Sequence, residues 1–244
     1  MTEKAMVAVC DILGFSNTVK NTTQERLKTY HIENIKNIIK TAFSNYKNPT
    51  SKPQSNMEVL ENNLLGYAFF SDTVLIYSVH DSRDGWRNVL NSAFYLLSYP
   101  ILWPYYKFRI GISYGEFYYN QQENIFAGKA LVEAAELERK QEWSGAALTN
   151  NAAKKFKGIN PEKETLIEYN VPVKQKDYKR FENLTVINWT TANHPKQSKK
   201  YNWMIREENG SNVEKYKNRK VEKMIRNTEK FHYETCVQCN VTKK

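Results

Sequence analysis

The sequence has no long hydrophobic run, few glycines and only three cysteines. No stretch approaches the ~18 apolar residues that a membrane-spanning helix needs, and the opening MTEKAMVAVCDILGF does not fit a secretory signal. An odd number of cysteines gives no disulfide framework. The 9 glycines, against 16 tyrosines, favour a globular α/β protein over a flexible or repetitive one. We therefore expect a cytoplasmic protein without a membrane partner.

Positive charge is present in excess, and most of the excess lies near the C-terminus. The net charge is +10, of which residues 196–244 contribute +7 through 13 Lys and Arg against 6 Asp and Glu. The remaining residues carry 23 against 20, a balance of +3. A basic tail can bind nucleic acid, but a charge run is more often a solvated, partly helical surface. We therefore do not expect a nucleic-acid partner.

Hydrophobic periodicity predicts an α+β protein. Strands are predicted at residues 4–12, 64–70, 73–79, 108–119, 145–150, 166–173 and 181–189. Helices are predicted at residues 24–46, 84–99, 128–143 and 212–231, with a shorter helix that ends at Phe156. Hairpins mixed with crossover helices predict a ferredoxin-like βαββαβ core, an antiparallel sheet with flanking helices. We expect one domain at residues 1–190 and a basic, partly helical C-terminal extension at residues 191–244.

Two aspartates stand where predicted strands end. Asp11 closes the first strand, and Asp72 lies at the tip of the hairpin formed by residues 64–79. Either residue alone is a usual turn or capping residue. If the two strands are neighbours, however, both carboxylates project from one edge of the sheet. Such hard oxygen ligands suit Mg²⁺ or Mn²⁺, and two such ions can hold the attacking and leaving oxygens of a phosphoryl transfer.

Four sequence blocks, in this order, resemble class III nucleotide cyclases. They are CDILGFS, FFSDTVLIYS, FRIGISYGE and the weaker helical block from Gly128 to Glu138, and the resemblance covers about residues 5–190. It implies that residues 1–190 form a cyclase catalytic domain. It also implies two Mg²⁺ or Mn²⁺ ions held by Asp11, Asp72 and the backbone carbonyl of Ile12.

The resemblance also implies how the triphosphate is held. Arg109 falls where the family places a basic residue on the triphosphate, and it is counted with Asp11 and Asp72 as catalytic. The alternative is a strand arginine paired with a carboxylate, because ion-pair networks imitate functional sites. The turn after the first strand, formed by Gly14, Phe15 and Ser16, can hold phosphate oxygens through its backbone N–H groups.

Four positions depart from the purine cyclases. Ala68 and Ile125 stand at the base-facing positions, where adenylate cyclases use a lysine and an acid to read the base. Val132 and Glu136 replace the asparagine and arginine that stabilise the transition state. Either the domain is inactive, or other cations meet the charge on the α-phosphate. The candidates are Arg139, Lys140, Lys154, Lys174, Lys176, Lys179 and Arg180.

The loss of both purine readers is similar to the pyrimidine cyclases of the bacterial Pycsar anti-phage system. That branch implies conversion of UTP to 3′,5′-cyclic UMP as a second messenger in anti-phage defence, by a homodimer with its sites at the subunit interface. One alternative is a cytidylate cyclase that makes cyclic CMP from CTP. Another is a catalytically degenerate cyclase fold that binds a nucleotide or nucleic acid.

The cysteines suggest no further chemistry. Cys236 and Cys239 form a lone C-x-x-C, and although His232 is nearby, no fourth ligand is evident for zinc. Cys10 lies in the first predicted strand, where core packing is the expected role.

Overall fold

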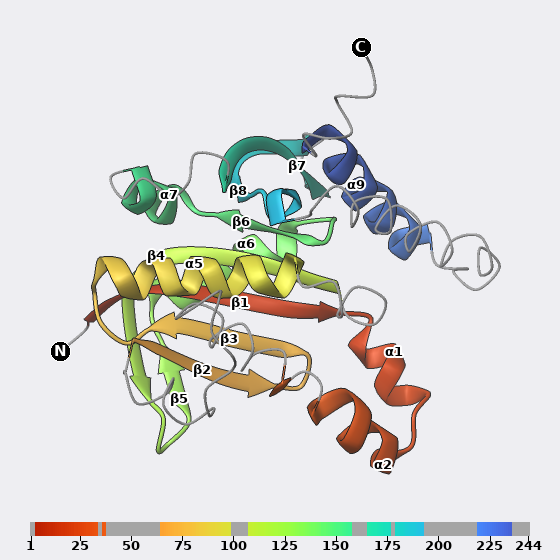
Figure 1. Ribbon diagram of the computed structural model, residues 1–244, viewed down its shortest axis with the longest axis horizontal. Helices are drawn as coiled ribbons and strands as arrows, with labels where there is room; N and C mark the ends of the chain where they lie inside the picture. Colours follow the sequence, from red (N-terminus) through yellow and green to blue (C-terminus); the bar gives the residue numbers. More distant parts are fainter. Residues whose placement is uncertain are drawn as a thin grey trace.

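Across the residues that the structure describes, the strands form an eight-stranded sheet (Figure 1). The computed structural model describes residues 3–33, 36–37, 64–98, 107–157, 165–176, 179–192 and 219–235. The strands are β1 (Glu3–Leu13), β2 (Leu65–Phe70), β3 (Thr73–Ser78), β4 (Lys107–Asn120), β5 (Ile125–Ala127), β6 (Gly145–Leu148), β7 (Leu166–Lys176) and β8 (Lys179–Ile187). Their order is β2-β3-β1-β4-β6-β8-β7, with β5 beside β4. All pairs are antiparallel except β4 with β6.

Helices cover both faces of this sheet. They are α1 (Phe15–Lys20), α2 (Gln24–Arg26) with a π-helical turn (Leu27–Ile32), α5 (Arg83–Ser98), α6 (Lys129–Lys140), α7 (Asn150–Lys157), a 3-10 turn (Trp189–Ala192) and α9 (Arg219–Thr235). Alternate residues of β1 face opposite sides, as strand geometry requires. Met6 and Ala8 share the larger core with α5, whereas Val7 and Val9 join a second cluster that includes α6 alanines.

The α+β prediction is confirmed, and most predicted elements are present within a few residues. The predicted helix at 128–143 ends at Lys140, because Gln141 adopts an extended conformation and forms a β-bridge with Val173. The predicted helix at 24–46 begins as expected, with Thr23 as its N-cap, but a π-helical turn follows α2. Residues 38–46 of that helix lie outside the described part of the chain.

The C-terminal helix α9 packs into the main core. Phe231 is fully buried, and its ring meets Trp143 edge-on at a centroid distance of 4.6 Å. The side chain of Asn227 donates to the carbonyl of Glu142 at 2.7 Å, and the hydroxyl of Thr228 accepts from the amide of Ser144 at 2.9 Å. A boundary at residue 190 stays a prediction, but residues 219–235 share the core of the first 190 residues.

A buried histidine in α9 predicts acid sensitivity. Burial lowers the pKa of His232 to about 4 from its ordinary value of 6.5, so the unfolded chain binds its proton first as the pH falls. The stability that the neutral His232 contributes is therefore fully present above about pH 6.5 and is lost as the pH falls toward 4. We expect this contribution to the free energy of unfolding to fall by about 2 kcal/mol between pH 7 and pH 5, as the difference between wild type and His232→Phe.

Urea denaturation at the two pH values checks this prediction. His232→Phe should flatten the pH dependence, whereas His80→Gln, at an exposed position, should leave it unchanged. An unchanged slope in His232→Phe would show that another group is responsible.

Candidate functional site

The first strand and the β2–β3 hairpin bring Asp11 and Asp72 to one end of the sheet. β3 is the hydrogen-bonded neighbour of β1, with Asp11 opposite Thr73. The amide of Ile12 donates to the carbonyl of Asp72 at 2.8 Å. A two-residue turn makes this possible, with Ser71 at a φ of 55°. The expectation that the two strands are neighbours is therefore met: β1 ends, and the antiparallel β3 begins, on the side where α1 lies (Figure 1).

The two carboxylates interact electrostatically. Burial raises the pKa of Asp11, the cation of Arg109 opposes this shift, and the negative charge of Asp72 raises the pKa further, leaving it above its usual value. Two carboxylates that repel each other favour a cation between them. Among the described residues, no three His, Cys, Asp or Glu side chains group as metal ligands. The pair fits Mg²⁺, which takes one or two carboxylates and completes its shell with water and substrate phosphates.

Arg109 is buried and divides its guanidinium between two carboxylates. It lies opposite Asp11 in the β1–β4 pairing, and its Nη2 donates to Asp11 Oδ2 at 2.9 Å. Its Nε donates to Glu138 Oε1, and its Nη1 donates to the carbonyl of Gln141 at 3.4 Å. The carboxylate-paired alternative therefore describes Arg109 in this structure. A contact with the triphosphate stays a prediction.

Glu138 is the site residue that the sequence analysis missed. Its side chain is only 6% exposed, and it lies on α6 against Arg109. Burial raises the pKa of Glu138, and the neighbouring Arg109 partly offsets the rise. The sequence did contain a signal for this position, because Ala130, Ala134 and Glu138 recur at the four-residue spacing of one helix face. In the structure the two alanines on that face are buried, and so is Glu138.

A second cation lies near the carboxylates. The positive charge of Lys174, on β7, lowers the pKa of both Asp11 and Glu138, and its Nζ donates to the carbonyl of Arg139. Of the other basic candidates, Lys140 forms an ion pair with Glu182 at 2.8 Å. The side chains of Lys176 and Lys179 lie outside the described part of the chain. Among the candidates whose side chains are described, Lys174 is the one whose charge acts on Asp11.

The turn that follows β1 leads directly into α1. Gly14 has a φ of +81°, a conformation that residues with a side chain rarely adopt. Phe15 is buried in the main core, while Ser16 is exposed. The side chain of Phe15 is therefore occupied by core packing, and this residue could contact a ligand only through its backbone. The turn's role in holding phosphate stays a prediction.

Three of the four predicted base-facing and transition-state positions are exposed to solvent. Ala68 is half-buried in β2, and Ile125 is exposed in β5. Val132 and Glu136 are exposed on α6, on the face opposite its buried alanines. A role of Ala68 and Ile125 in facing the base stays a prediction, and Val132 and Glu136 provide no group on this face of α6 that could stabilise a phosphate.

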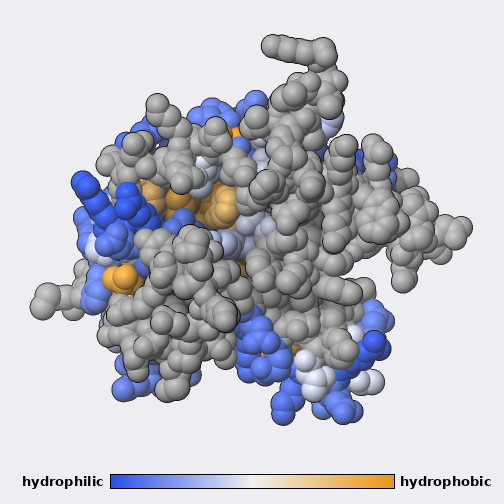
Figure 2. All heavy atoms as spheres, viewed as in Figure 1, coloured by the Kyte–Doolittle hydropathy of each residue, from blue (hydrophilic) through white to orange (hydrophobic). Residues whose placement is uncertain are grey.

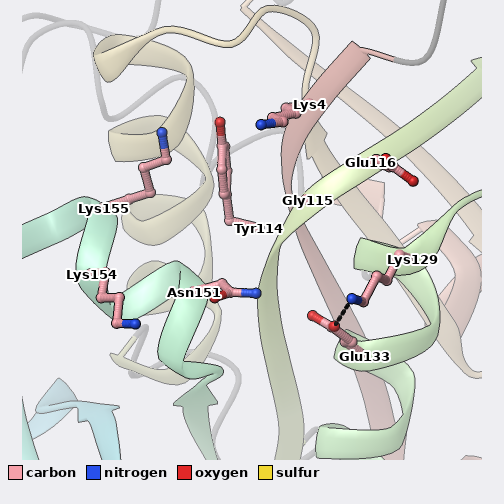
Figure 3. A pocket seen from close by; sticks show the side chains of 9 residues that line it. All are labelled: Lys4, Tyr114, Gly115, Glu116, Lys129, Glu133, Asn151, Lys154 and Lys155. Carbon is pink, nitrogen blue, oxygen red and sulfur yellow. Dashed lines mark ion pairs between the residues drawn. The ribbon is translucent and has the colours of Figure 1, made fainter.

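A hollow of about 540 Å³ lies at the other end of the sheet (Figure 3). Its lining residues are Lys4, Tyr114, Gly115, Glu116, Lys129, Glu133, Asn151, Lys154 and Lys155. Lys155 extends over the ring of Tyr114 at 4.1 Å from its centroid. Lys4 and Asp11 are seven residues apart on β1, roughly 23 Å along an extended strand, so this hollow is separate from the aspartate site.

The prediction for Cys10 can be compared with the structure. Cys10 is fully buried, as expected for a core residue, and burial raises the pKa of its thiol. Cys236 and Cys239 lie outside the described residues.

In the part of the chain that the structure describes, no helix is long and apolar enough to cross a membrane. The described surface on the face in Figure 2 is largely hydrophilic, with a small apolar area.

Solved structures of nucleotide cyclases are similar to this chain. The catalytic core of a rhodopsin-guanylyl cyclase with converted specificity, in complex with ATPαS, has a TM-score of 0.53 and 11% identity, over 76% of this chain and 95% of that chain. The chain has the fold of a class III nucleotide cyclase catalytic domain. At this identity the likeness shows the fold alone.

Two further solved structures are less similar by TM-score. An adenylate cyclase from Trypanosoma brucei in its monomeric state gives 0.48 at 11% identity, over 77% of this chain and 90% of that chain. An adenylate/guanylate cyclase/hydrolase from Silicibacter pomeroyi gives 0.45 at 16% identity, over 77% and 97%. No family model and no curated protein matches the sequence.

Proposed function

We propose that this chain is a metal-dependent nucleotide cyclase that converts a nucleoside triphosphate into a 3′,5′-cyclic nucleotide and pyrophosphate. The observation that carries the proposal is the position of Asp11 and Asp72 at one end of the sheet, in a cyclase fold. The 3′-oxygen forms a bond to the α-phosphorus, the bond from that phosphorus to the bridging oxygen breaks, and pyrophosphate leaves. The proton of the 3′-hydroxyl passes to solvent.

The roles of the residues follow from their charges and positions. Asp11, Asp72 and the carbonyl of Ile12 would hold two Mg²⁺ or Mn²⁺ ions. When bound, these ions supply charge neutralisation at the reacting oxygens and the triphosphate. Arg109 and the backbone N–H groups of Gly14–Ser16 would hold the β- and γ-phosphates. The protein thus contributes positioning and electrostatic stabilisation.

We further propose a pyrimidine substrate, with UTP preferred over CTP. Ala68 and Ile125 cannot hydrogen-bond a purine edge, and a site that reads a base by hydrogen bonds rejects analogues strongly. The preference for uracil rests on the resemblance to uridylate cyclases. That resemblance also suggests a cytoplasmic second messenger of anti-phage defence.

Incubation with all four triphosphates at equal concentration, with Mn²⁺, tests the substrate. We expect cyclic UMP as the main product, because a single well-placed hydrogen bond to the exocyclic group of uracil is worth ~1–3 kcal/mol when its loss leaves a buried partner unpaired. Predominant cyclic CMP would overturn only the uracil preference. Predominant cyclic AMP or cyclic GMP would overturn the pyrimidine proposal.

The alternative function is a degenerate cyclase fold that binds a nucleotide without turnover. Val132 and Glu136 favour it, because neither can stabilise negative charge on an α-phosphate. Asp11 and Asp72 oppose it, because a fold that only binds gains nothing from two carboxylates that repel each other. Nucleotide binding without a cyclic product from any of the four triphosphates would favour this alternative.

We also propose a two-fold homodimer with a site at each side of the interface. Three exposed apolar side chains support a partner surface: Phe70 on β2, Ile125 on β5 and Val132 on α6 are 47%, 45% and 54% exposed. We expect light scattering to give a dimer at assay concentration, and Val132→Glu to weaken the dimer about tenfold or more. The matched change Val19→Glu, at an exposed position on α1, should leave the dimer intact. An active monomer would contradict the proposal.

A further inference from the structure

We infer that Glu138 is a positioning residue that anchors one edge of the Arg109 guanidinium, so that the opposite edge can exchange Asp11 for a phosphate oxygen of the substrate. This inference rests on the proposed cyclase function and assigns a role to a residue that lies outside the metal pair.

The hydrogen bonds of Arg109 separate into two groups. Nε faces Glu138, which lies on α6, whereas Nη2 faces Asp11, at the end of β1, at 2.9 Å. The side chain of Glu138 is 6% exposed and that of Asp11 is 21% exposed. The guanidinium therefore has a buried partner on one edge and a more accessible partner on the other.

Close packing of α6 against β4 fixes the position of Glu138, the buried partner of Arg109. A Cβ at Gly111, two residues after Arg109 on β4, would lie 2.1 Å from the carbonyl oxygen of Ala134 and 2.6 Å from the amide nitrogen of Glu138. The side chain of Gln141 also ties the end of α6 to β4, because its Nε2 donates to the carbonyls of Ile110 at 2.9 Å and Leu137 at 3.0 Å. Glu138 is thus held at a constant position relative to the strand that carries Arg109.

Asp11, the more accessible partner of Arg109, is also the carboxylate that a divalent cation would bind. A cation that binds Asp11 and Asp72 competes with Arg109 for the Asp11 carboxylate. A buried arginine without any carboxylate partner would be strongly destabilising, so release from Asp11 requires a second anion. Glu138 supplies that anion and keeps the guanidinium in place, with its Nη2 edge directed toward the site.

The consequence is a coupling between Glu138 and cation affinity that acts through Arg109. Without the charge of Glu138, Asp11 is the remaining anion in contact with the guanidinium, and the cation has to displace a stronger ion pair. Without Arg109, no cationic side chain competes with the metal ion for the Asp11 carboxylate, and the charge of Glu138 should then have little effect on cation affinity.

A double-mutant cycle on Mn²⁺ binding tests this coupling. We expect Glu138→Gln to raise the Mn²⁺ dissociation constant about tenfold and Arg109→Gln to lower it about tenfold, with the double variant close to Arg109→Gln. The matched control Glu116→Gln removes a carboxylate from an exposed position on the same strand as Arg109. It lies well beyond the screening length and should leave the constant within about twofold of wild type.

Two results would overturn the inference while leaving the cyclase proposal intact. One is an equal weakening by Glu138→Gln in both backgrounds, which would mean that Glu138 acts directly on the cation. The other is no effect of Glu138→Gln. Failure of the wild-type protein to bind Mn²⁺ would instead contradict the proposed function.

A second readout does not depend on whether Arg109→Gln folds. Nuclear magnetic resonance of the arginine Nε–H groups, assigned with Arg109→Lys, should show one slowly exchanging signal from Arg109. We expect this signal to persist when Mg²⁺ is added to the wild type and to exchange rapidly in Glu138→Gln. Loss of the signal on addition of Mg²⁺ would contradict the anchoring role.

Discussion

Asp72→Asn is expected to lower the turnover number about a thousandfold or more while the protein stays folded. Asparagine has nearly the same shape, and the hydrogen bond from the Ile12 amide to the carbonyl of residue 72 does not involve the side chain. The change removes one of the two negative charges that the proposed cations need. Loss of activity should therefore occur without loss of the β2–β3 turn.

Turnover with Mn²⁺, together with a thermal unfolding curve for the same sample, measures both effects. Asp84→Asn is the matched control, because it removes a carboxylate from an exposed position in the first turn of α5. Its turnover should stay within about twofold of wild type, as surface substitutions away from special features have small effects. Near-normal turnover in Asp72→Asn would rule out the assignment of this carboxylate to the metal site.

Gly111→Ala is expected to have the second large effect, a loss of about 3 kcal/mol in the free energy of unfolding. The new Cβ would lie 2.1 Å from the carbonyl oxygen of Ala134, which is backbone and cannot rotate away. Helix α6 would have to move off the sheet, and Glu138 would move with it.

The next glycine on the same strand provides the control. A Cβ at Gly115 would have its nearest contact at 3.8 Å, with the Cβ of Ala130. We expect Gly115→Ala to change the free energy of unfolding by less than about 1 kcal/mol. Urea denaturation of the two variants measures the difference. Equal stability of the two variants would mean that α6 does not pack as closely on β4 as the structure indicates.

Local patterns in the sequence predicted the part of the site that depends on neighbouring residues. Alternation of apolar residues predicted β1, and two β-rich runs around a polar pair predicted the hairpin with Asp72 at its tip. Both features are set within about ten residues of chain. The only step that needed tertiary structure was the pairing of β1 with β3, and the structure meets that expectation.

Contacts between distant residues could not be predicted in the same way. Arg109 pairs with Asp11, 98 residues away, and with Glu138, 29 residues away. The sequence therefore left the role of Arg109 open. The packing of α9 is a second example. The many charged residues of this helix predicted a solvent-exposed segment, but Phe231 is buried against Trp143 and Trp189. Its charge pattern indicated an extension, whereas its apolar face belongs to the core.

The most direct test of the proposed function is the identity of the phosphorus products. After incubation of the wild-type chain with UTP and Mg²⁺, we expect ³¹P nuclear magnetic resonance to show pyrophosphate and a 3′,5′-cyclic phosphodiester in equal amounts. Asp72→Asn should give neither signal under the same conditions. Nucleoside diphosphate with orthophosphate would indicate hydrolysis, and unchanged substrate with UTP and with each of the other three triphosphates would indicate an inactive domain. Either result would contradict the account of this chain as a cyclase.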